Sequence, residues 1–586
     1  MRTFPMTRIG PGTRLEAALA NLEARAIVQA AMPGVVNSPL ILQLGKAPLS
    51  EIVERVRDLS GNEEAAARFW AALGQIDEST TVRRHELFRS PNPRLDPPTV
   101  ETASSAATWT ETVQLHGYFE LTLTDVARDN PFLDVDLDVD FTGPAGQTRA
   151  GGFYDGDGIW RVRLYASRAG DWTFRTRSNA RGMNGVSGAF TVTTAQAGPG
   201  VVRVADTFHF RHDNGDRHLP LGTTAYAWHH QPTEREELTL ATLETSPFTK
   251  VRMSVFPKAY LYNSDEPERL PFEPTVDGGF DPTRFDIDFF QHLDRRVQEL
   301  AARGIEADIV LYHAYDRWGF SDLDPVADDR YVRYVVRRLG AFANVWWSMA
   351  NEYDLVRSKT EADWERLAGI VTAEDPSGHL LSIHNGFDFY DYTKAWVTHC
   401  SVQRIDLYRT AENTDLWRER WNKPIVIDEC GYEGDIEQGW GNLTPEEFVR
   451  RAWEGAVRGG YVNHGETYRD PNEVLWWSKG GVLRGRSPQR IAFLRGVIEA
   501  SPAGVLDPLP GDWDVPWGGV ADRYIVVYLG AGQSALRSVQ LPEGEWRGEI
   551  LDTWEMTVLP IGDALSGLTT IELPSKPYLA LRFCRD

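Results

Sequence analysis

The chain has 586 residues, which is too long for a single hydrophobic core, so we expect two to four domains. Its formal net charge of -23 argues against nucleic acid or an anionic membrane as a partner, because both would repel it. The 20 tryptophans and 20 tyrosines would suit a carbohydrate site, since aromatic rings cover the apolar faces of sugars, although composition alone favours a tryptophan-rich core.

The N-terminal residues do not resemble a targeting signal. Glu16, Glu23 and Arg25 interrupt the apolar positions that a signal peptide needs, and no later segment is apolar for the length of a membrane span. Three widely spaced cysteines fit reduced thiols better than a disulfide framework: Cys400, Cys430 and Cys584. We therefore expect a cytoplasmic protein.

The first part of the chain is expected to hold two different small domains. Residues 1–80 show apolar positions at helical spacing, as at Leu15, Leu19 and Leu22, and predict a small helical domain. Residues 81–110 are rich in proline and small polar residues and predict a linker. Residues 111–198 alternate between apolar and polar positions with frequent turns, which predicts a β-sandwich domain.

Residues 199–505 are expected to form the largest domain. Short apolar runs alternate there with helical patterns, which is typical of a parallel α/β architecture, and eight such runs predict a closed (β/α)₈ TIM barrel. The expected strands are Leu219–Tyr226, Thr249–Phe256, Ala307–Leu311, Asn344–Met349, Leu380–Ile383, Trp396–Val402, Ile425–Asp428 and Tyr461–Gly465. Residues 506–586 alternate again and predict a C-terminal β-sandwich domain.

Two of the expected barrel strands end in a carboxylate. The fourth ends in Asn351-Glu352 and the seventh ends in Glu429. Because the carboxyl ends of barrel strands meet at the mouth where substrates bind, both side chains should face the same cleft. A pair of carboxylates flanking a substrate is what glycoside hydrolysis requires.

These two strand ends resemble the clan A glycoside hydrolases, a superfamily of retaining (β/α)₈ enzymes. Three further runs are similar to the apiosidase-like glycosidases, which carry an N-terminal β-sandwich and a C-terminal β-domain: Gly222-Thr223-Thr224, Phe153-Tyr154-Asp155-Gly156 and Asp428-Glu429-Cys430-Gly431-Tyr432-Glu433-Gly434. The resemblance covers about residues 110–586. The helical segment before it lies outside the resemblance, and we assign that segment no function.

The resemblance implies a role for each residue of the central constellation. Glu352 would be the general acid and base, and Glu429 the nucleophile of a double displacement that retains the anomeric configuration, with carboxyl groups about 5 to 5.5 Å apart. Arg252 would hydrogen-bond the nucleophile, and Asn351 would hold the sugar 2-hydroxyl. The alternative for Arg252 is a structural ion pair within the barrel.

Other polar and aromatic residues follow the strands and are expected to grip the sugar. They are Trp228, His230, His313, Tyr315, Asn385, His399, His464, Glu466, Trp476 and Trp477. His399 fits a core histidine equally well, whereas Trp476 or Trp477 is expected to stack on sugar.

Two alternative functions stay open at this point. A metal-dependent hydrolase could use His229, His230, His313, His399 and His464, although their spacing matches no metal motif. A barrel that binds glycans without catalysis is the other alternative. No phosphate-binding loop is present, so a nucleotide cofactor is not expected. Because the histidine spacing matches no metal motif, no metal is expected either.

The substrate is expected to be a small oligosaccharide or glycoside that an exo-acting enzyme cleaves, because long loops after strands two and three could wall off one end of the cleft. Both pyranosides, such as a β-glucoside, and furanosides, such as an apioside or arabinofuranoside, fit this expectation. Exposed aromatic loops would also permit a homo-oligomer.

Overall fold

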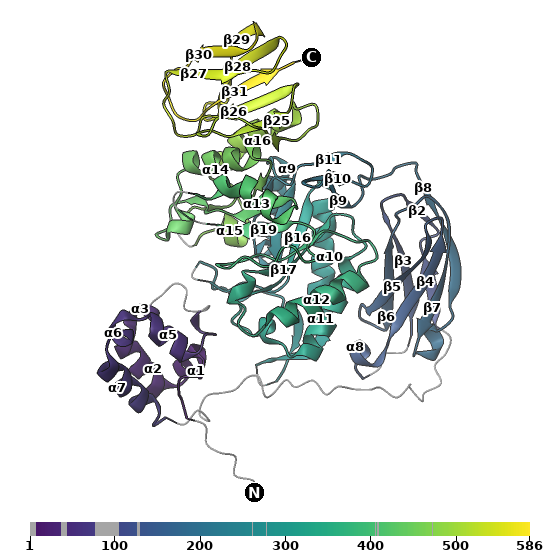
Figure 1. Cartoon of the computed structure of the whole chain (residues 1–586). Helices are drawn as coiled ribbons and strands as arrows, with labels where there is room; N and C mark the ends of the chain where they lie inside the picture. The colour runs from purple at the N-terminus through teal and green to yellow at the C-terminus, as the bar shows by residue number, and fades with distance from the viewer. Residues whose placement is uncertain are drawn as a thin grey trace.

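A computed structural model describes residues 8–36, 44–76, 105–125, 129–260, 262–276, 278–404, 406, 409–470 and 473–585. Its parts follow one another along the chain as a helical domain, a curled β-sheet, an α/β barrel and a C-terminal β-domain (Figure 1). No helix among these residues combines the length and hydropathy needed to cross a membrane.

The helical domain packs short helices around its own apolar core. Its helices are α1 (Leu15–Ala20), α2 (Leu22–Ala31), α3 (Pro33–Val36), α5 (Leu49–Arg55), α6 (Arg57–Ser60) and α7 (Glu63–Leu73). Asparagine side chains cap two of them: Asn21 accepts from the amides of residues 23 and 24, and Asn62 accepts from the amide of residue 65. Leu15, Leu49 and Leu73 are fully buried in the core that results.

The next domain is a curled eight-stranded sheet closed over a core of aromatic and branched residues. Its strands are β1 (Ala106–Trp109), β2 (Thr112–Gln114), β3 (Tyr118–Thr124), β4 (Leu137–Gly143), β5 (Gly146–Tyr154), β6 (Ile159–Tyr165), β7 (Gly170–Ser178) and β8 (Ser187–Thr193). The first half of β5 pairs with β4 and its second half with β6, so β5 joins the two layers. β1 lies in the segment that we predicted to be a linker. We missed this strand because its pairing with β3 cannot be seen in the residues of β1 alone.

The barrel is built from eight parallel strands of the described chain. They are β12 (Gly222–Thr224), β13 (Lys250–Ser254), β16 (Glu306–His313), β17 (Val345–Asn351), β18 (Leu381–Ser382), β19 (Cys400–Gln403), β20 (Ile425–Glu429) and β22 (Tyr461–Val462). β12 to β18 pair in parallel order, as do β19, β20 and β22. Single parallel bridges from His384 to Ser401 and from Thr223 to His464 join the two groups and close the ring.

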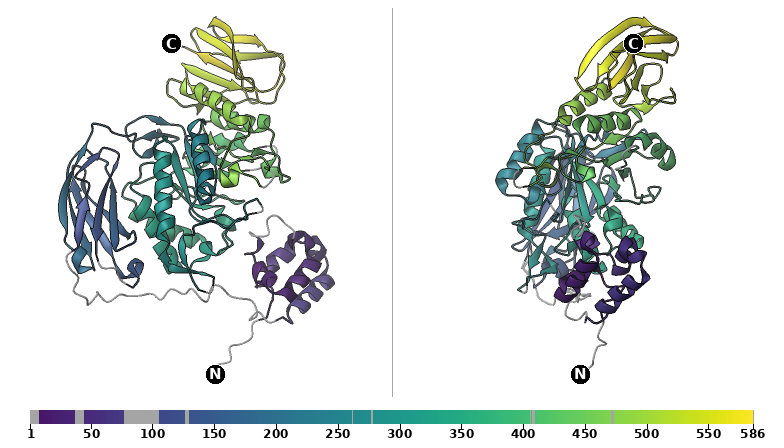
Figure 2. Two further views of the ribbon diagram at one scale, coloured as in Figure 1. Left: turned by 180° about the vertical axis from the view of Figure 1, so that it is seen from behind. Right: turned by 90° about the vertical axis from the view of Figure 1, so that its left-hand side faces the viewer.

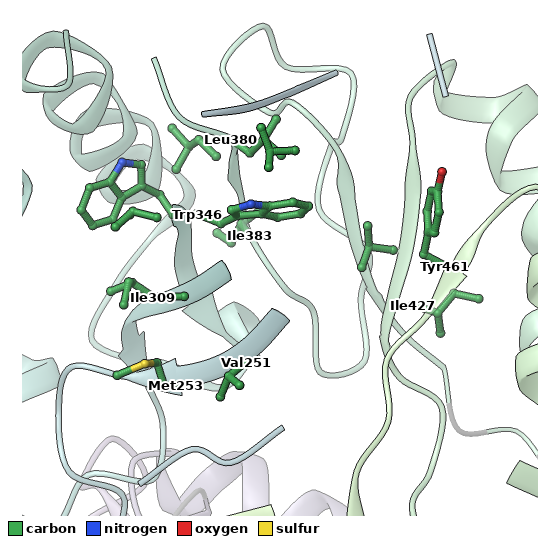
Figure 3. Close-up of a cluster of buried hydrophobic side chains, with 14 of the residues drawn as sticks. Val251, Met253, Ile309, Trp346, Leu380, Ile383, Ile427 and Tyr461 are labelled. Carbon is green, nitrogen blue, oxygen red and sulfur yellow. The ribbon is translucent and has the colours of Figure 1, made fainter. Parts of the chain in front are cut away.

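Helices cover the outside of this ring (Figure 2). They are α9 (Thr233–Glu244), α10 (Ile287–Ala301), α11 (Pro325–Leu339), α12 (Glu361–Glu374), α13 (Thr414–Trp421), α14 (Pro445–Val457) and α16 (Ser487–Glu499). The residues between β18 and β19 form a helix-free crossover. The hydrophobic core of the barrel includes Val251, Ile309, Trp346, Ile427 and Tyr461, which project from five different strands (Figure 3).

The curled sheet and the barrel share a buried ionic network. Arg163 of β6 donates to Asp294 of α10 over 2.9 Å and also to the carbonyl of Arg338, over 2.9 Å. Arg338 of α11 in turn pairs with Asp294 over 2.9 Å and with Asp155 of the β5–β6 turn over 2.8 Å. These side chains are almost completely buried. Loss of one partner would leave a buried charge unpaired, so the network holds the two domains together.

The C-terminal domain is a six-stranded antiparallel sheet that faces a two-stranded ribbon. The sheet contains β24 (Asp507–Pro508), β25 (Trp517–Val520), β26 (Tyr524–Tyr528), β28 (Trp546–Asp552), β29 (Thr557–Leu565) and β31 (Leu579–Cys584), and the ribbon contains β27 (Leu536–Gln540) and β30 (Leu568–Glu572). Trp546, Val539 and Ile571 are buried together in its core. In Figures 1 and 2 it lies at the opposite side of the barrel from the helical domain.

Candidate active site

A pocket of about 510 Å³ lies at the carboxyl ends of the barrel strands. Its size falls in the range of small-molecule sites. Most of its wall comes from barrel loops and strand ends, and the rest comes from the helical domain. The barrel residues nearest to the chemistry are Lys258, Tyr260, Tyr315, Asn351, Glu352, Gln403, Glu429, Tyr432 and Trp477.

Glu352 occupies the pocket in a strained backbone conformation. β17 ends at Asn351, and Glu352 follows with φ 54° and ψ 60°, in the left-handed region. For a residue other than glycine this conformation costs on the order of 1–3 kcal/mol, and such strain concentrates at functional sites. The neighbouring loop approaches so closely that a Cβ on Gly386 would lie 3.3 Å from the Glu352 Cβ.

Three side chains hold the Glu352 carboxyl group. The Tyr315 hydroxyl and the Asn351 amide, at 3.2 Å, donate to Oε2, while the Gln403 amide donates to Oε1 over 3.1 Å. Burial and the negative charge of Glu429 raise the pKa of Glu352 to about 7, against the lowering effect of the Tyr315 hydrogen bond. Glu352 therefore carries a proton in a large fraction of molecules at neutral pH.

Glu429 is the last residue of β20 and faces the same pocket. The Tyr226 hydroxyl donates to its Oε1. Burial raises the pKa of Glu429, while the positive charges of Lys258 and Arg252 and the Tyr226 hydrogen bond act in the opposite direction. Burial thus raises the pKa of both carboxyl groups, while the cations and the hydroxyl group around Glu429 favour its ionised form.

Lys258 is a pocket residue that we did not predict. Its ammonium lies 3.6 Å from the ring centre of Tyr226, 4.1 Å from that of Tyr315 and 4.5 Å from that of Trp477. Burial lowers its pKa to about 8, although Glu429 and Glu352 counteract this effect. A cation held by three aromatic rings between two carboxylates stabilises their negative charge. The signal was its place just after the second strand, in the aromatic run Lys258-Ala259-Tyr260-Leu261-Tyr262.

Arg252 lies behind the pocket rather than against Glu429. Its guanidinium contacts Asn351 at 3.4 Å and forms ion pairs with Asp308 at 3.4 Å and Asp428 at 3.5 Å. The resemblance implied a hydrogen bond from Arg252 to Glu429. Instead, Arg252 contacts Asn351, and its positive charge lowers the pKa of Glu429. Burial would lower the pKa of Arg252, but the two aspartates outweigh it and raise that pKa, so the cation is permanent.

Two of the predicted sugar-binding residues instead orient residues of the pocket wall. The His313 ring accepts the Tyr315 amide over 3.1 Å while its other nitrogen donates to the Phe256 carbonyl over 3.0 Å. The Asn385 side chain accepts a hydrogen bond from the backbone amide of Gln403 over 3.0 Å. Both therefore fix groups that hydrogen-bond Glu352.

The side chains after the first strand turn away from the mouth. Trp228 is fully buried, and His230 donates to the Val255 carbonyl over 3.1 Å and stacks on Phe289 of α10. This placement corrects the expectation that Trp228 and His230 bind sugar. The physical reason is the 3-10 turn Trp228–His230, which directs these side chains into the core between strands and helices.

His399 lies at the wrong end of its strand for the pocket. It directly precedes β19, and its ring packs against Trp346 at 5.2 Å and Phe210 at 6.0 Å, measured between ring centres. Since the mouth lies where the strands end, this position belongs to the core histidine that we considered as the alternative. Its pKa is lowered by burial to about 4, so the ring is neutral.

The predicted residues after the eighth strand also lie in two different places, either at the pocket or in the core. Trp477 lines the pocket, but Trp476 donates to Thr223 over 2.8 Å in the core. His464 also contacts Thr223, at 2.9 Å, and stacks on a buried phenylalanine. Glu466 accepts the backbone amides of residues 484 and 485 and fastens the loop before α16. For Trp476, His464 and Glu466 the structural role replaces the predicted contact with sugar.

The histidines that we considered as metal ligands do not converge on one point. Within the described part of the chain, two groups of side chains could hold an ion: His212 with His218 and Glu306, and Glu433 with His464 and Glu466. Neither group lines the pocket that contains Glu352 and Glu429.

Comparison with known proteins agrees with this geometry. The model of the apiosidase-like catalytic domain matches residues 205–493, and two domains of unknown function, DUF5060 and DUF5605, match residues 112–179 and 513–584. The crystal structure of a proposed glycoside hydrolase from Bacteroides vulgatus is 35% identical with a TM-score of 0.77, and the match covers 81% of this chain and 100% of that chain. The chain belongs to the apiosidase-like glycoside hydrolases.

More distant structures share the fold of this apiosidase-like protein. A glycoside hydrolase family 5 protein from Bacteroides vulgatus is 16% identical with a TM-score of 0.53, and the match covers 66% of this chain and 94% of that chain. No curated protein matches the chain. None of the matching family models includes a residue before 112, so the helical domain is an addition to the family's shared part.

Proposed function

We propose that this protein is a retaining glycoside hydrolase in which Glu429 is the nucleophile and Glu352 is the acid and base. The observation that carries the proposal is the pair itself: both carboxyl groups line one pocket, and the charge of Glu429 helps to raise the pKa of Glu352 to about 7. Two carboxyl groups in one pocket, one of them with a pKa raised to about 7, match the requirements of a double displacement.

In the first step Glu429 attacks the anomeric carbon. The bond from that carbon to the leaving oxygen breaks, and Glu352 gives its proton to the leaving oxygen, so that a glycosyl ester of Glu429 forms. Tyr226 keeps the attacking oxygen oriented through its hydrogen bond. Lys258 offsets negative charge on the pair during this step.

In the second step water releases the sugar. Glu352, now ionised, removes a proton from water, and the resulting oxygen attacks the anomeric carbon while the bond to Glu429 breaks. Two inversions at the same carbon leave the anomeric configuration unchanged. The Gln403 and Asn351 amides hold Glu352 in place for both proton transfers.

The substrate that fits this site is a short glycoside. The pocket holds about 510 Å³, which is in the range of small-molecule sites, and residues of the helical domain form part of its wall. Cleavage of a terminal sugar is therefore the proposed mode of action. Pyranosides and furanosides both belong in the test.

The direct test measures p-nitrophenol release from aryl pyranosides and furanosides. We expect the wild type to hydrolyse one sugar class and Glu352→Gln and Glu429→Gln each to lose at least about 1000-fold in kcat, because each variant removes a group that changes bonds or protons in the transition state. Proton NMR of the first anomer released should show retention.

Four results would count against the proposal. Inversion of configuration, or activity that survives in Glu429→Gln, would remove Glu429 as nucleophile. Loss of activity on adding a chelator would favour a metal-dependent hydrolase, and glycan binding without turnover would favour a non-catalytic protein. His230→Asn is the control, because it changes one of the histidines that we considered as metal ligands at a position outside the pocket.

A further inference from the structure

The helical domain contributes part of the pocket wall. Leu44, Ala47 and Arg55 belong to this domain, and all three line the pocket that contains Glu352 and Glu429. Figures 1 and 2 show the domain beside the barrel in views that differ by rotation, so the contact is not an effect of projection. A domain that the family models do not include thus reaches the catalytic pair.

Ion pairs between buried groups fix the domain in this position. Lys46 pairs with Asp322 of the loop after β16 over 3.1 Å, and the two side chains are 2% and 5% exposed. Although burial alone would lower the pKa of Lys46, the charges of Asp322 and Asp316 raise it, so the ammonium is charged across the usual pH range. Gly45, Lys46 and Ala47 are all buried.

A second contact brings an arginine from each domain to the rim of the pocket. Glu51 Oε1 accepts a hydrogen bond from Arg55 of its own domain over 2.9 Å and one from Arg357 of the barrel over 3.1 Å. Both arginines line the pocket. Because a guanidinium has five N–H donors and Glu51 binds one nitrogen of each, the pair can also donate to hydroxyl groups of a ligand.

This wall meets the barrel at the loop that follows Glu352. Arg357 and Leu355 follow Glu352 directly along the chain and line the rim that the helical domain touches. The general acid must face the leaving oxygen, so the leaving group extends toward the residues around Glu352.

We propose that the helical domain forms the leaving-group subsite and that the leaving group is itself a sugar. This proposal rests on the proposed function. Arg55 and Arg357 bind hydroxyl groups of the departing sugar, while Leu44, Ala47 and Phe387 cover its apolar face. The subsite favours a disaccharide over a glycoside whose leaving group is a single atom.

The test compares two leaving groups on one sugar. Both substrates carry the sugar that the aryl panel identifies. In the disaccharide the leaving group is glucose, and in the glycosyl fluoride it is fluoride. In Arg55→Ala the ratio of kcat/KM for the disaccharide to kcat/KM for the fluoride should fall about tenfold, chiefly through KM, because charge-assisted hydrogen bonds to the leaving sugar are lost.

Arg68→Ala is the matched control. Arg68 lies in α7 of the same domain and pairs with Glu64 at i,i+4 spacing, as Arg55 pairs with Glu51, but it lies outside the pocket lining. This variant should keep the wild-type ratio. An unchanged ratio in Arg55→Ala, or an equal fall in both variants, would overturn the proposal.

Calorimetric binding of cellobiose and xylobiose to Glu429→Gln, alone or combined with each arginine variant, separates this proposal from the proposed function. Weaker binding with Arg55→Ala than with Arg68→Ala would support the subsite even if the wild type turned over no glycoside. Equal binding in the two combinations would contradict it.

Discussion

The Tyr315 hydroxyl lowers the pKa of Glu352. It donates to Glu352 Oε2, and this hydrogen bond stabilises the ionised carboxylate and so lowers its pKa. The ring itself is held by the contact of its backbone amide with His313. One phenol group thus tunes the acid within a site where burial and Glu429 push the pKa upward.

Removal of this hydroxyl should shift the pH profile upward. Glu352 must be protonated for the first step, so wild-type kcat/KM should fall as the pH rises through about 7. In Tyr315→Phe the lost hydrogen bond raises the pKa of Glu352, and the alkaline limb should move to higher pH. Measurement of kcat/KM against pH checks this. Tyr260→Phe, which changes another pocket phenol, should leave the limb in place, and a downward shift in Tyr315→Phe would refute the assignment.

Sequence patterns located the chemical centre but not its immediate support. Glu352, Glu429 and Asn351 could be predicted because each ends a strand, and strand ends are visible as apolar runs. We did not predict Lys258, which lies just after the second strand, or Gln403, which ends β19, because periodicity does not show which of the strand-end side chains turn into the pocket. His399 and His464 lie in the core because their position within the barrel depends on strand register, which periodicity does not fix.

At the scale of elements, the loop at Lys46 joins the helical domain to the loop after β16. Lys46→Met should leave Asp322 buried without its partner and cost about 3–5 kcal/mol in the stability of the docked state. Hydrogen exchange at residues 44–55 should accelerate as the contact opens. The double variant Lys46→Met with Asp322→Leu removes both charges and should recover much of this loss. Equal exchange in the single and the double variant would show that the ion pair does not hold the domain.

The order of the barrel strands was predictable from sequence, whereas two details of the fold were not. Each expected run overlaps an observed barrel strand. The crossover from β18 to β19 lacks a helix, although the pattern led us to expect alternation. The docking of the helical domain was also invisible, because pairs such as Lys46 with Asp322 are far apart in sequence.

At the scale of the whole molecule, the curled sheet and the barrel should unfold together. Asp294 accepts from both Arg163 and Arg338, so Asp294→Ala leaves two buried guanidinium groups with fewer partners and should cost about 3–5 kcal/mol. Calorimetry should show one lowered transition for both domains. Asp140→Ala removes two surface ion pairs of the sheet, with Arg149 and Arg177, and should cost less than about 1 kcal/mol. Separate melting of sheet and barrel would contradict this coupling.

The pocket wall combines residues from distant parts of the chain, from Leu44 to Trp477. During synthesis the helical domain is made before the barrel strands that carry Glu352 and Glu429. A chain that stops short of Trp477 lacks part of the pocket wall. The pocket is therefore assembled only when most of this sequence has been made.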